Sequence, residues 1–397
     1  MTHVTKGFSL AHRAALMGAG ARRKLMTIAS ALVVASLVVV GVGHAAGPID
    51  ELAALNFGAG PSSIGGLCLF CNIAVFTPGG PPNKPPTVNI TGTPLPGSIS
   101  TLSGAAGIAT TPLGALAVTS GLLSAVMEYA PNANGASGPV VFIAPGTAPA
   151  PATLDISLPQ GIGFVPIAVG PPLEQSFYVA NFTGDPKPAD AGSVILFPGN
   201  AGSSTWTGNI LGTIHNLLVC EGLGLTSTAL LLPVGVATDA SGNAYVANSG
   251  NAALGAPSYV TEYSLTDAST STTGCFAPIN LVGLGTLQSA NGVAVDTAGN
   301  IWVSDLVANA IFEFSPAGAV LTEIRGKRTT LDSPMGIALS PSGLAAGTDD
   351  VYVANSRRGT VLLFPNVNSI GVQNLRPTRA LGGARTRLTI PIGVAPL

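Results

Sequence analysis

One phrase, residues 291–314 (NGVAVDTAGNIWVSDLVANAIFEF), constrains the fold of this chain more than any other feature. It contains three short runs rich in β-branched and aromatic residues, at 292–295, 301–304 and 311–314, separated by Gly, Asn and Asp. Such runs, bounded by turn residues, predict three hairpin-linked strands. Residues 320–324 are expected to add a fourth strand and complete an antiparallel sheet.

The same phrase recurs along the chain. Clear copies begin at Gly235 and Gly336, looser copies at Gly107 and Gly161, and a last partial copy at Gly393. From Gly107 onward, successive leading glycines are 54, 74, 57, 44 and 57 residues apart. A repeat of about 40–50 residues with insertions is typical of propellers, in which each repeat forms one four-stranded blade. The sequence therefore predicts an all-β fold.

The repeated segments P-x-G-[VI]-A-x-D and G-N-[IL]-[YW]-V-[AS]-[DN] resemble the NHL repeat, over about residues 67–397. The resemblance implies a β-propeller, with distant similarity to gluconolactonase-like and streptogramin lyase-like propellers; five repeats and one blade shared by the two ends of the chain give six blades. It does not imply one function, because this architecture hosts enzymes, binding modules and scaffolds.

The two ends of the chain are expected to share one blade. Residues 388–395 begin a repeat that stops after its first strand, whereas the strands expected around residues 68–76 and 88–90 lack an innermost partner. We predict that the C-terminal strand docks beside residues 68–76 and removes the open edges of the ring. The expected organisation is a leader at 1–46, a linker at 47–66 and the propeller at 67–397.

Residues 1–46 have the pattern of an export signal. Basic residues without any acidic one precede an apolar run at 25–42 and a small-residue cleavage site near Ala45. The run Arg22–Met26 resembles a twin-arginine signal; an ordinary secretory signal and an uncleaved membrane anchor are the alternatives. The mature protein is expected outside the cytoplasm, periplasmic or secreted, and membrane-bound only through an uncleaved leader.

Four cysteines would meet an oxidising compartment there. Cys220 and Cys275 flank one blade and are predicted to form a disulfide. Cys68 and Cys71 have C-x-x-C spacing but no second such pair and no nearby His, so a small-loop disulfide or two buried thiols is favoured over zinc. His215, the only histidine beyond the leader, is interpreted as a buried or rim residue.

In propeller lactonases and lyases, the residue before the leading glycine often carries a metal ligand or a catalytic group. The matching positions here are Ala106, Gln160, Val234, Asn291, Met335 and Ile392. Only Gln160 and Asn291 are polar and none is acidic, whereas calcium-like cations prefer carboxylates. Gln160 and Asn291 are therefore predicted ligand-binding residues, without a catalytic or metal-ligating set and without a cofactor. Trp206, in the longest insertion, is a further contact candidate.

Other recurring residues are interpreted as structural. Asn181, Asn248, Asp305 and Asn355, which end second strands, are expected to bond backbone amides, and so are Asp239 and Asp296 in the D-x-x-G-N turns. The aromatic residues at one second-strand position are expected to pack between blades: Tyr178, Tyr245, Trp302 and Tyr352.

Composition narrows the range of possible functions and partners. The net charge is −2 and the mature part has no basic run, which argues against nucleic acid as a partner. We expect a monomeric binding or scaffold module for a protein, glycan or other small ligand. The alternative is a metal-assisted lactonase, hydrolase or lyase at one mouth of the central channel. That enzyme would need a divalent cation such as calcium and carboxylates from elsewhere, such as Glu174, Asp185 or Glu221.

Overall fold

The structure is a computed structural model. It describes residues 39–40, 51–57, 71–77, 81–95, 99–145, 156–166, 169, 175–183, 192–199, 210–222, 224–250, 255–341, 349–367 and 370–397.

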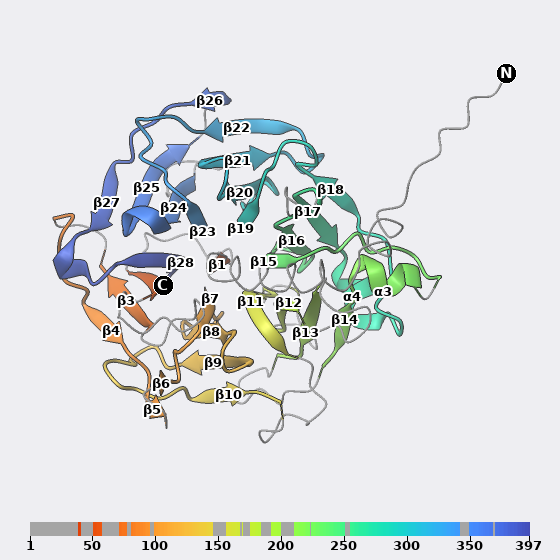
Figure 1. The fold of residues 1–397 in the computed structure, drawn as a ribbon, viewed down its shortest axis with the longest axis horizontal. Helices are drawn as coiled ribbons and strands as arrows, with labels where there is room; N and C mark the ends of the chain where they lie inside the picture. The colour runs from red at the N-terminus through yellow and green to blue at the C-terminus, as the bar shows by residue number, and fades with distance from the viewer. Residues whose placement is uncertain are drawn as a thin grey trace, which may run out of the picture.

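Six antiparallel sheets surround a common axis (Figure 1), and each contributes four strands from the axis outward. The innermost strands are β7 (Ala105–Thr110), β11 (Ser157–Phe164), β15 (Pro233–Thr238), β19 (Ala290–Val295), β23 (Pro334–Pro341) and β28 (Ile390–Pro396). The second strands are β8 (Leu116–Ser120), β12 (Phe177–Thr183), β16 (Ala244–Asn248), β20 (Ile301–Asp305), β24 (Asp349–Asn355) and β2 (Leu52–Phe57).

The third strands are β9 (Ala125–Tyr129), β13 (Ser193–Phe197), β17 (Tyr259–Tyr263), β21 (Ala310–Phe314), β25 (Thr360–Val367) and β3 (Asn72–Phe76). The outer strands are β10 (Val141–Ile143), β14 (Gly212–Ile214), β18 (Asn280–Val282), β22 (Val320–Ile324), β27 (Arg379–Gly382) and β4 (Val88–Ile90). Each innermost strand contacts the next one around the ring, and β28 contacts β7. The predicted six-bladed β-propeller is confirmed.

The ring closes through a blade that both ends of the chain build. Its strand order is β28–β2–β3–β4, and the β2–β28 pairing runs from Leu52 opposite Pro396 to Phe57 opposite Ile390. The shared blade was predicted, but the predicted partner of its C-terminal strand was wrong. The C-terminal strand pairs with β2, a segment expected to be part of a linker, rather than directly with β3. β2 is thus a strand of the shared blade, and its short apolar run gave a weaker signal than the repeat phrase.

Two short strands add to the blades by parallel pairing. In β26 (Gly371–Gln373), Val372 lies opposite Glu323 of β22, so a loop of the repeat that begins at Gly336 becomes a fifth strand of the neighbouring blade. β1 (Val39–Val40) pairs with β7 and lies near the centre of the ring (Figure 1). A two-stranded hairpin, β5 (Pro94–Leu95) and β6 (Ile99–Ser100), completes the strands.

The core consists of apolar layers between adjacent blades. One layer joins β15–β17 to β19–β21 through Val234, Tyr245, Val293 and Phe312. Strands with buried side chains on both faces need this arrangement, because each blade is covered by two neighbours. The four recurring aromatic residues lie in these layers, with Tyr178 fully buried and Trp302 1% exposed, which confirms their packing role.

Within the described residues the helices are short: α3 (Leu217–Gly222), α4 (Leu265–Thr270), and the 3-10 turns η3 (Ser356–Arg358) and η4 (Ala384–Thr386). The side chain of Ser264 caps α4 by accepting from the amide of Asp267. α4 lies so close to β14 that Gly212 has no room for a Cβ beside the carbonyl of Ala268. Helix α4 therefore covers an outer strand of the preceding blade. Among the described residues, no helix is both long and apolar enough to cross a membrane.

Candidate functional site

Every innermost strand has a register shift at its leading glycine. In β11 the shift lies between Pro159 and Ile162, and in β19 between Ala290 and Val293; the other four innermost strands show the same break. A bulge of this kind re-aims one side chain at the rim of a barrel or ring. We call the residues before the leading glycines the bulge ring: Ala106, Gln160, Val234, Asn291, Met335 and Ile392.

The leading glycines are required by close packing between blades. A Cβ added at Gly235 would lie 2.5 Å from the carbonyl oxygen of Asn291, and one added at Gly161 would lie 2.8 Å from that of Val234. Gly107 and Gly292 face the next carbonyl of the bulge ring in the same way. The bulge-ring carbonyls therefore lie at the seams between blades, where no larger residue than glycine fits.

Hydroxyl groups join two of these seams. Thr119 Oγ1 accepts from the amide of Gly107 at 2.6 Å and donates to the carbonyl of Gln160 at 2.5 Å. Ser304 Oγ accepts from the amide of Gly292 at 2.9 Å and donates to the carbonyl of Met335. At Gln160 and Met335 the backbone of the bulge ring is thus fixed by hydrogen bonds to the preceding blade, which gives the side chains there a fixed frame.

The two predicted ligand residues are both deeply buried in this frame. Gln160 is 3% exposed and Asn291 is 1% exposed. The Gln160 side chain reaches towards the preceding blade, where its Nε2 lies 3.8 Å from the ideal Cβ position of Gly121, and Nε2 donates to the carbonyl of Leu158 at 3.3 Å. Gln160 Oε1 is buried and accepts no hydrogen bond from any described residue. Trp206 lies outside the described residues.

Backbone strain beside Gln160 is part of the repeat and does not mark this blade. Leu158 has φ of 45°, which is unusual for a bulky residue. Leu232 and Ser333 have φ of 53° and 55° at the corresponding positions, each directly before the proline that opens an innermost strand. The left-handed residue is therefore a blade-entry feature, and the unsatisfied oxygen of Gln160 is what distinguishes this position.

Carboxylates are not gathered at the bulge ring. The described residues contain no group of three or more His, Cys, Asp or Glu side chains arranged to hold a metal ion. Of the acidic residues that the enzyme alternative would need, Glu221 is exposed at the end of α3, while Glu174 and Asp185 lie outside the described residues.

The residues that end the second strands hold the loops that enter the blades. Asp305 is buried and accepts from the amides of Gln288 at 2.6 Å and Ala308 at 2.9 Å. Asn248 Oδ1 accepts from the amide of Leu231, and Asn355 Oδ1 accepts from that of Asp332. These contacts confirm a structural role for the three side chains.

The shared blade has an equivalent residue that the repeat phrase did not reveal. Asn56, at the same place in β2, accepts from the amides of Thr389 and Ile390 and donates to the carbonyl of Arg387. Its signal was the dipeptide Asn56–Phe57 at the end of an apolar run, which is too short to indicate a strand by itself.

The D-x-x-G-N turns are also structural. Asp239 Oδ1 accepts from the amides of Ser241 and Asn243, and Asp296 Oδ1 accepts from those of Ala298 and Asn300. In both turns the second carboxylate oxygen accepts from the Asn side chain. Both carboxylates are therefore occupied within their own turns, as expected for Asx-type turns.

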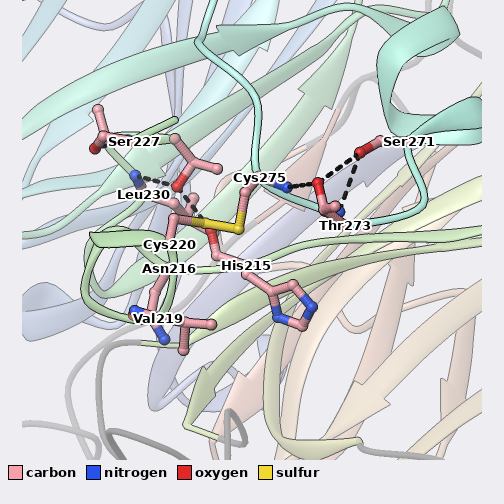
Figure 2. Close-up of a disulfide and its surroundings, with 12 residues drawn as sticks. His215, Asn216, Val219, Cys220, Ser227, Leu230, Ser271, Thr273 and Cys275 are labelled. Carbon is pink, nitrogen blue, oxygen red and sulfur yellow. Dashed lines mark hydrogen bonds between the residues drawn. A yellow bond between two sulfur atoms is a disulfide. The ribbon is translucent and has the colours of Figure 1, made fainter. Parts of the chain in front are cut away.

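The predicted disulfide Cys220–Cys275 is present and joins α3 to the segment between α4 and β18 (Figure 2). The amide of His215 donates to the carbonyl of Gly274 at 3.0 Å beside this bond, and its half-buried imidazole points away from the sulfur atoms (Figure 2). His215 is thus a rim residue, directly after the outer strand β14 of its blade. Cys71 is also disulfide-bonded, and Cys68 lies outside the described residues.

Buried glutamates occur at one position of the third strands. Glu128 in β9 and Glu313 in β21 are 7% and 8% exposed. Burial raises the pKa of both carboxyl groups; at Glu313 a hydrogen bond from Thr322 opposes this rise and the charge of Asp296 adds to it. These groups lie in the layers between blades and not in the bulge ring.

Comparison with known proteins shows the fold alone. No family model matches the chain, and no curated protein matches it significantly. A chain of a nidogen/laminin complex is similar over 87% of this chain and 98% of its own, at 11% identity and a TM-score of 0.51. A Bacteroides caccae protein of unknown function is similar over 88% of this chain and 99% of its own, at 11% identity and a TM-score of 0.52. A streptogramin B lyase structure covers 68% of this chain and 67% of its own, at 11% identity and a TM-score of 0.39.

Proposed function

We propose that this propeller is a binding module that works outside the cytoplasm and takes its ligand at the bulge ring, with Gln160 and Asn291 as the polar contacts. A disulfide between Cys220 and Cys275 supports an oxidising compartment, in agreement with the export pattern of residues 1–46. The bulge ring combines four apolar side chains with two amides on a rigid frame, which is the composition of a small-ligand site.

The buried oxygen of Gln160 carries this proposal. A buried acceptor without a partner costs about 1–3 kcal/mol relative to one that is hydrogen-bonded. Because Oε1 has no donor among the described residues, a ligand that supplies an N–H or O–H group there would recover this free energy. Hydroxyl-rich and amide-bearing ligands, such as sugars and peptides, have the required donors.

The comparison with the nidogen/laminin complex supports a binding role only at the level of the fold. A propeller-like chain of similar extent is part of a protein complex there. Protein or small-ligand binding requires no catalytic group, which agrees with a bulge ring that lacks acidic residues.

Thermal unfolding with panels of sugars, short peptides and divalent cations tests the proposal, since a ligand that binds only the native state raises the unfolding midpoint. We expect a sugar or peptide to raise it for the natural protein and to lose this effect in Gln160→Leu and Asn291→Leu. Thr273→Ala, on the exposed loop near the disulfide, is the control and should retain the shift. A shift that persists in both leucine variants, or none with any sugar or peptide, would overturn the assignment. A cation-specific shift would favour the hydrolase alternative.

A further inference from the structure

The positive charges of the propeller are concentrated in one part of the chain. Residues 47–324 contain two lysines, no arginine and fifteen acidic residues. Residues 325–397 contain nine basic residues and three acidic ones. The overall charge of −2 hides this separation, which creates a local positive field on an otherwise acidic molecule.

Seven of the nine basic residues lie on three loops. We call them the basic sector: Arg325, Lys327, Arg328, Arg357, Arg358, Arg385 and Arg387. The loops join β22 to β23, β24 to β25 through η3, and β27 to β28 through η4. All seven residues are exposed.

The three loops touch one another, so the basic sector is continuous. η3 occupies the middle: the amide of Arg357 donates to the carbonyl of Asp332 on one side. On the other side, Ser356 Oγ donates to the carbonyl of Pro391 at 2.6 Å, and Gly359 packs against the carbonyl of Thr389. One surface therefore spans the loop that leads into β23 and the loop that leads into β28 of the shared blade.

Most of these charges have no counter-charge among the residues that the structure describes. Arg325 pairs with Glu323 at 3.1 Å and Arg358 with Asp332 at 3.7 Å. The other five basic side chains form no ion pair with a described residue: Lys327, Arg328, Arg357, Arg385 and Arg387. Their mutual repulsion is relieved when an anionic partner arrives.

The basic sector lies where the chain enters the innermost strands β23 and β28. It therefore shares a face of the ring with the bulge-ring residues of these two strands. The loop before β23 is held by Asn355, which accepts from the amide of Asp332, and the loop before β28 by Asn56, which accepts from that of Thr389. Met335 and Ile392 of the bulge ring follow these loops directly. A partner on the basic sector would reach this edge of the ring.

We propose that the basic sector is a docking surface for an acidic segment of a partner protein, rich in Asp and Glu. The proposal rests on the binding role proposed above but not on the ligand at Gln160. Six of the seven residues are arginines, whose planar guanidinium groups bind carboxylates through two parallel hydrogen bonds. Ile390, 38% exposed beside Thr389, adds an apolar contact of the kind that protein interfaces combine with arginine.

A short acidic segment fits this surface better than an extended polyanion. The basic sector occupies only the loops around the blade of β23 and the shared blade, whereas residues 47–324 contain fifteen acidic residues and two lysines. A long nucleic acid or a broad anionic membrane would extend beyond the three loops onto blades that supply no arginine and only two lysines. A segment confined to the three loops would keep all of its carboxylates beside basic residues.

The test uses the purified full-length protein and a fluorescent peptide of alternating Glu and Gly, with a Gln/Gly peptide as the neutral probe. Anisotropy should show binding of the Glu peptide only, weakening as salt rises. Arg328→Gln/Arg357→Gln should weaken binding about three- to tenfold. Arg376→Gln/Arg379→Gln also removes two positive charges, but outside the basic sector. It should change the affinity less than twofold, which is about the contribution of one weak surface ion pair.

Equal binding of both peptides, or equal losses in the two double variants, would overturn the proposal. Single-stranded DNA and phosphatidylglycerol vesicles are the competing probes. If either binds as tightly as the Glu peptide and loses affinity in Arg328→Gln/Arg357→Gln, the surface recognises phosphate and the assignment to protein carboxylates is wrong. If the Glu peptide does not bind, the thermal shift expected from a ligand at Gln160 is unaffected. The two proposals can therefore be rejected independently of each other.

Discussion

The carbonyl oxygen of Met335 lies 2.5 Å from the place where Gly292 would carry a Cβ. The same ideal Cβ lies 2.8 Å from Ser304 Oγ and 2.9 Å from the amide nitrogen of Ile337, so the obstruction consists mainly of fixed backbone. This contact explains why a glycine opens the repeat.

Gly292→Ala should therefore force apart the blade of β19 and the blade of β23. We expect the free energy of unfolding to fall by about 1–3 kcal/mol, the usual cost of overpacking. Gly222→Ala is the matched control, because no heavy atom lies within 4 Å of its ideal Cβ position; it should change stability by no more than about 0.5 kcal/mol. Chemical denaturation measures both. Equal effects would show that the seam is not tightly packed.

Asp305→Ala should be among the most destabilising single changes at a second-strand end. The carboxylate accepts from the amides of Gln288, Ser289, Val307 and Ala308, and the substitution leaves these donors without an acceptor. The free energy of unfolding should drop by about 2–4 kcal/mol. Asp267→Ala, on the exposed side of α4, should cost no more than about 0.5 kcal/mol. A similar cost for both would contradict the loop-holding role of Asp305.

Removing the disulfide with Cys220→Ser/Cys275→Ser should lower the free energy of unfolding by about 2–4 kcal/mol, since the bond closes a long loop of the unfolded chain. The two cysteines are 55 residues apart in sequence. A reductant should destabilise the natural protein more than the double variant, because the variant retains only the disulfide that involves Cys71. Identical sensitivity to reductant would assign no stability to the Cys220–Cys275 bond.

The free energy of unfolding should depend on pH through the two buried glutamates. Burial raises the pKa of Glu128 and Glu313 in the native state, so their protonated forms favour folding. This contribution is complete below the pKa of the unfolded chain and is lost as pH rises through the higher native pKa. Denaturation between acidic and neutral pH should show a decline that Glu128→Gln/Glu313→Gln flattens. An unchanged slope in this variant would place the pH dependence elsewhere.

The blade repeat was predictable because it follows from short-range rules. Gly292, Asp296 and Asp305 each recur at one place in the phrase, and each has a backbone contact that only a few residue types can make. The strand β2 escaped prediction because its role depends on β28, about the whole chain length away. No local pattern around Asn56 indicates that distant partner.

The candidate site was predictable only in part. The position of Gln160 follows from the repeat, but its unsatisfied Oε1 depends on how its side chain lies against the neighbouring blade, and the sequence does not fix that direction. The basic sector had a sequence signal, the excess of arginine after residue 324, which the net charge of the whole chain conceals. Only the contacts of η3 with both flanking loops show that these charges form one surface.

The antiparallel pairing of Leu52 with Pro396 has a mechanical consequence. Strands β2 and β28 enter and leave the ring at the same end, and the amide of Leu397 donates to the carbonyl of Glu51 next to that point. A force applied between these two strand ends loads the hydrogen-bonded pairs one after another instead of all at once. Traction on the chain would therefore peel the shared blade open from its rim, and the ring would release its first and last strands before any of the other five blades bears the load.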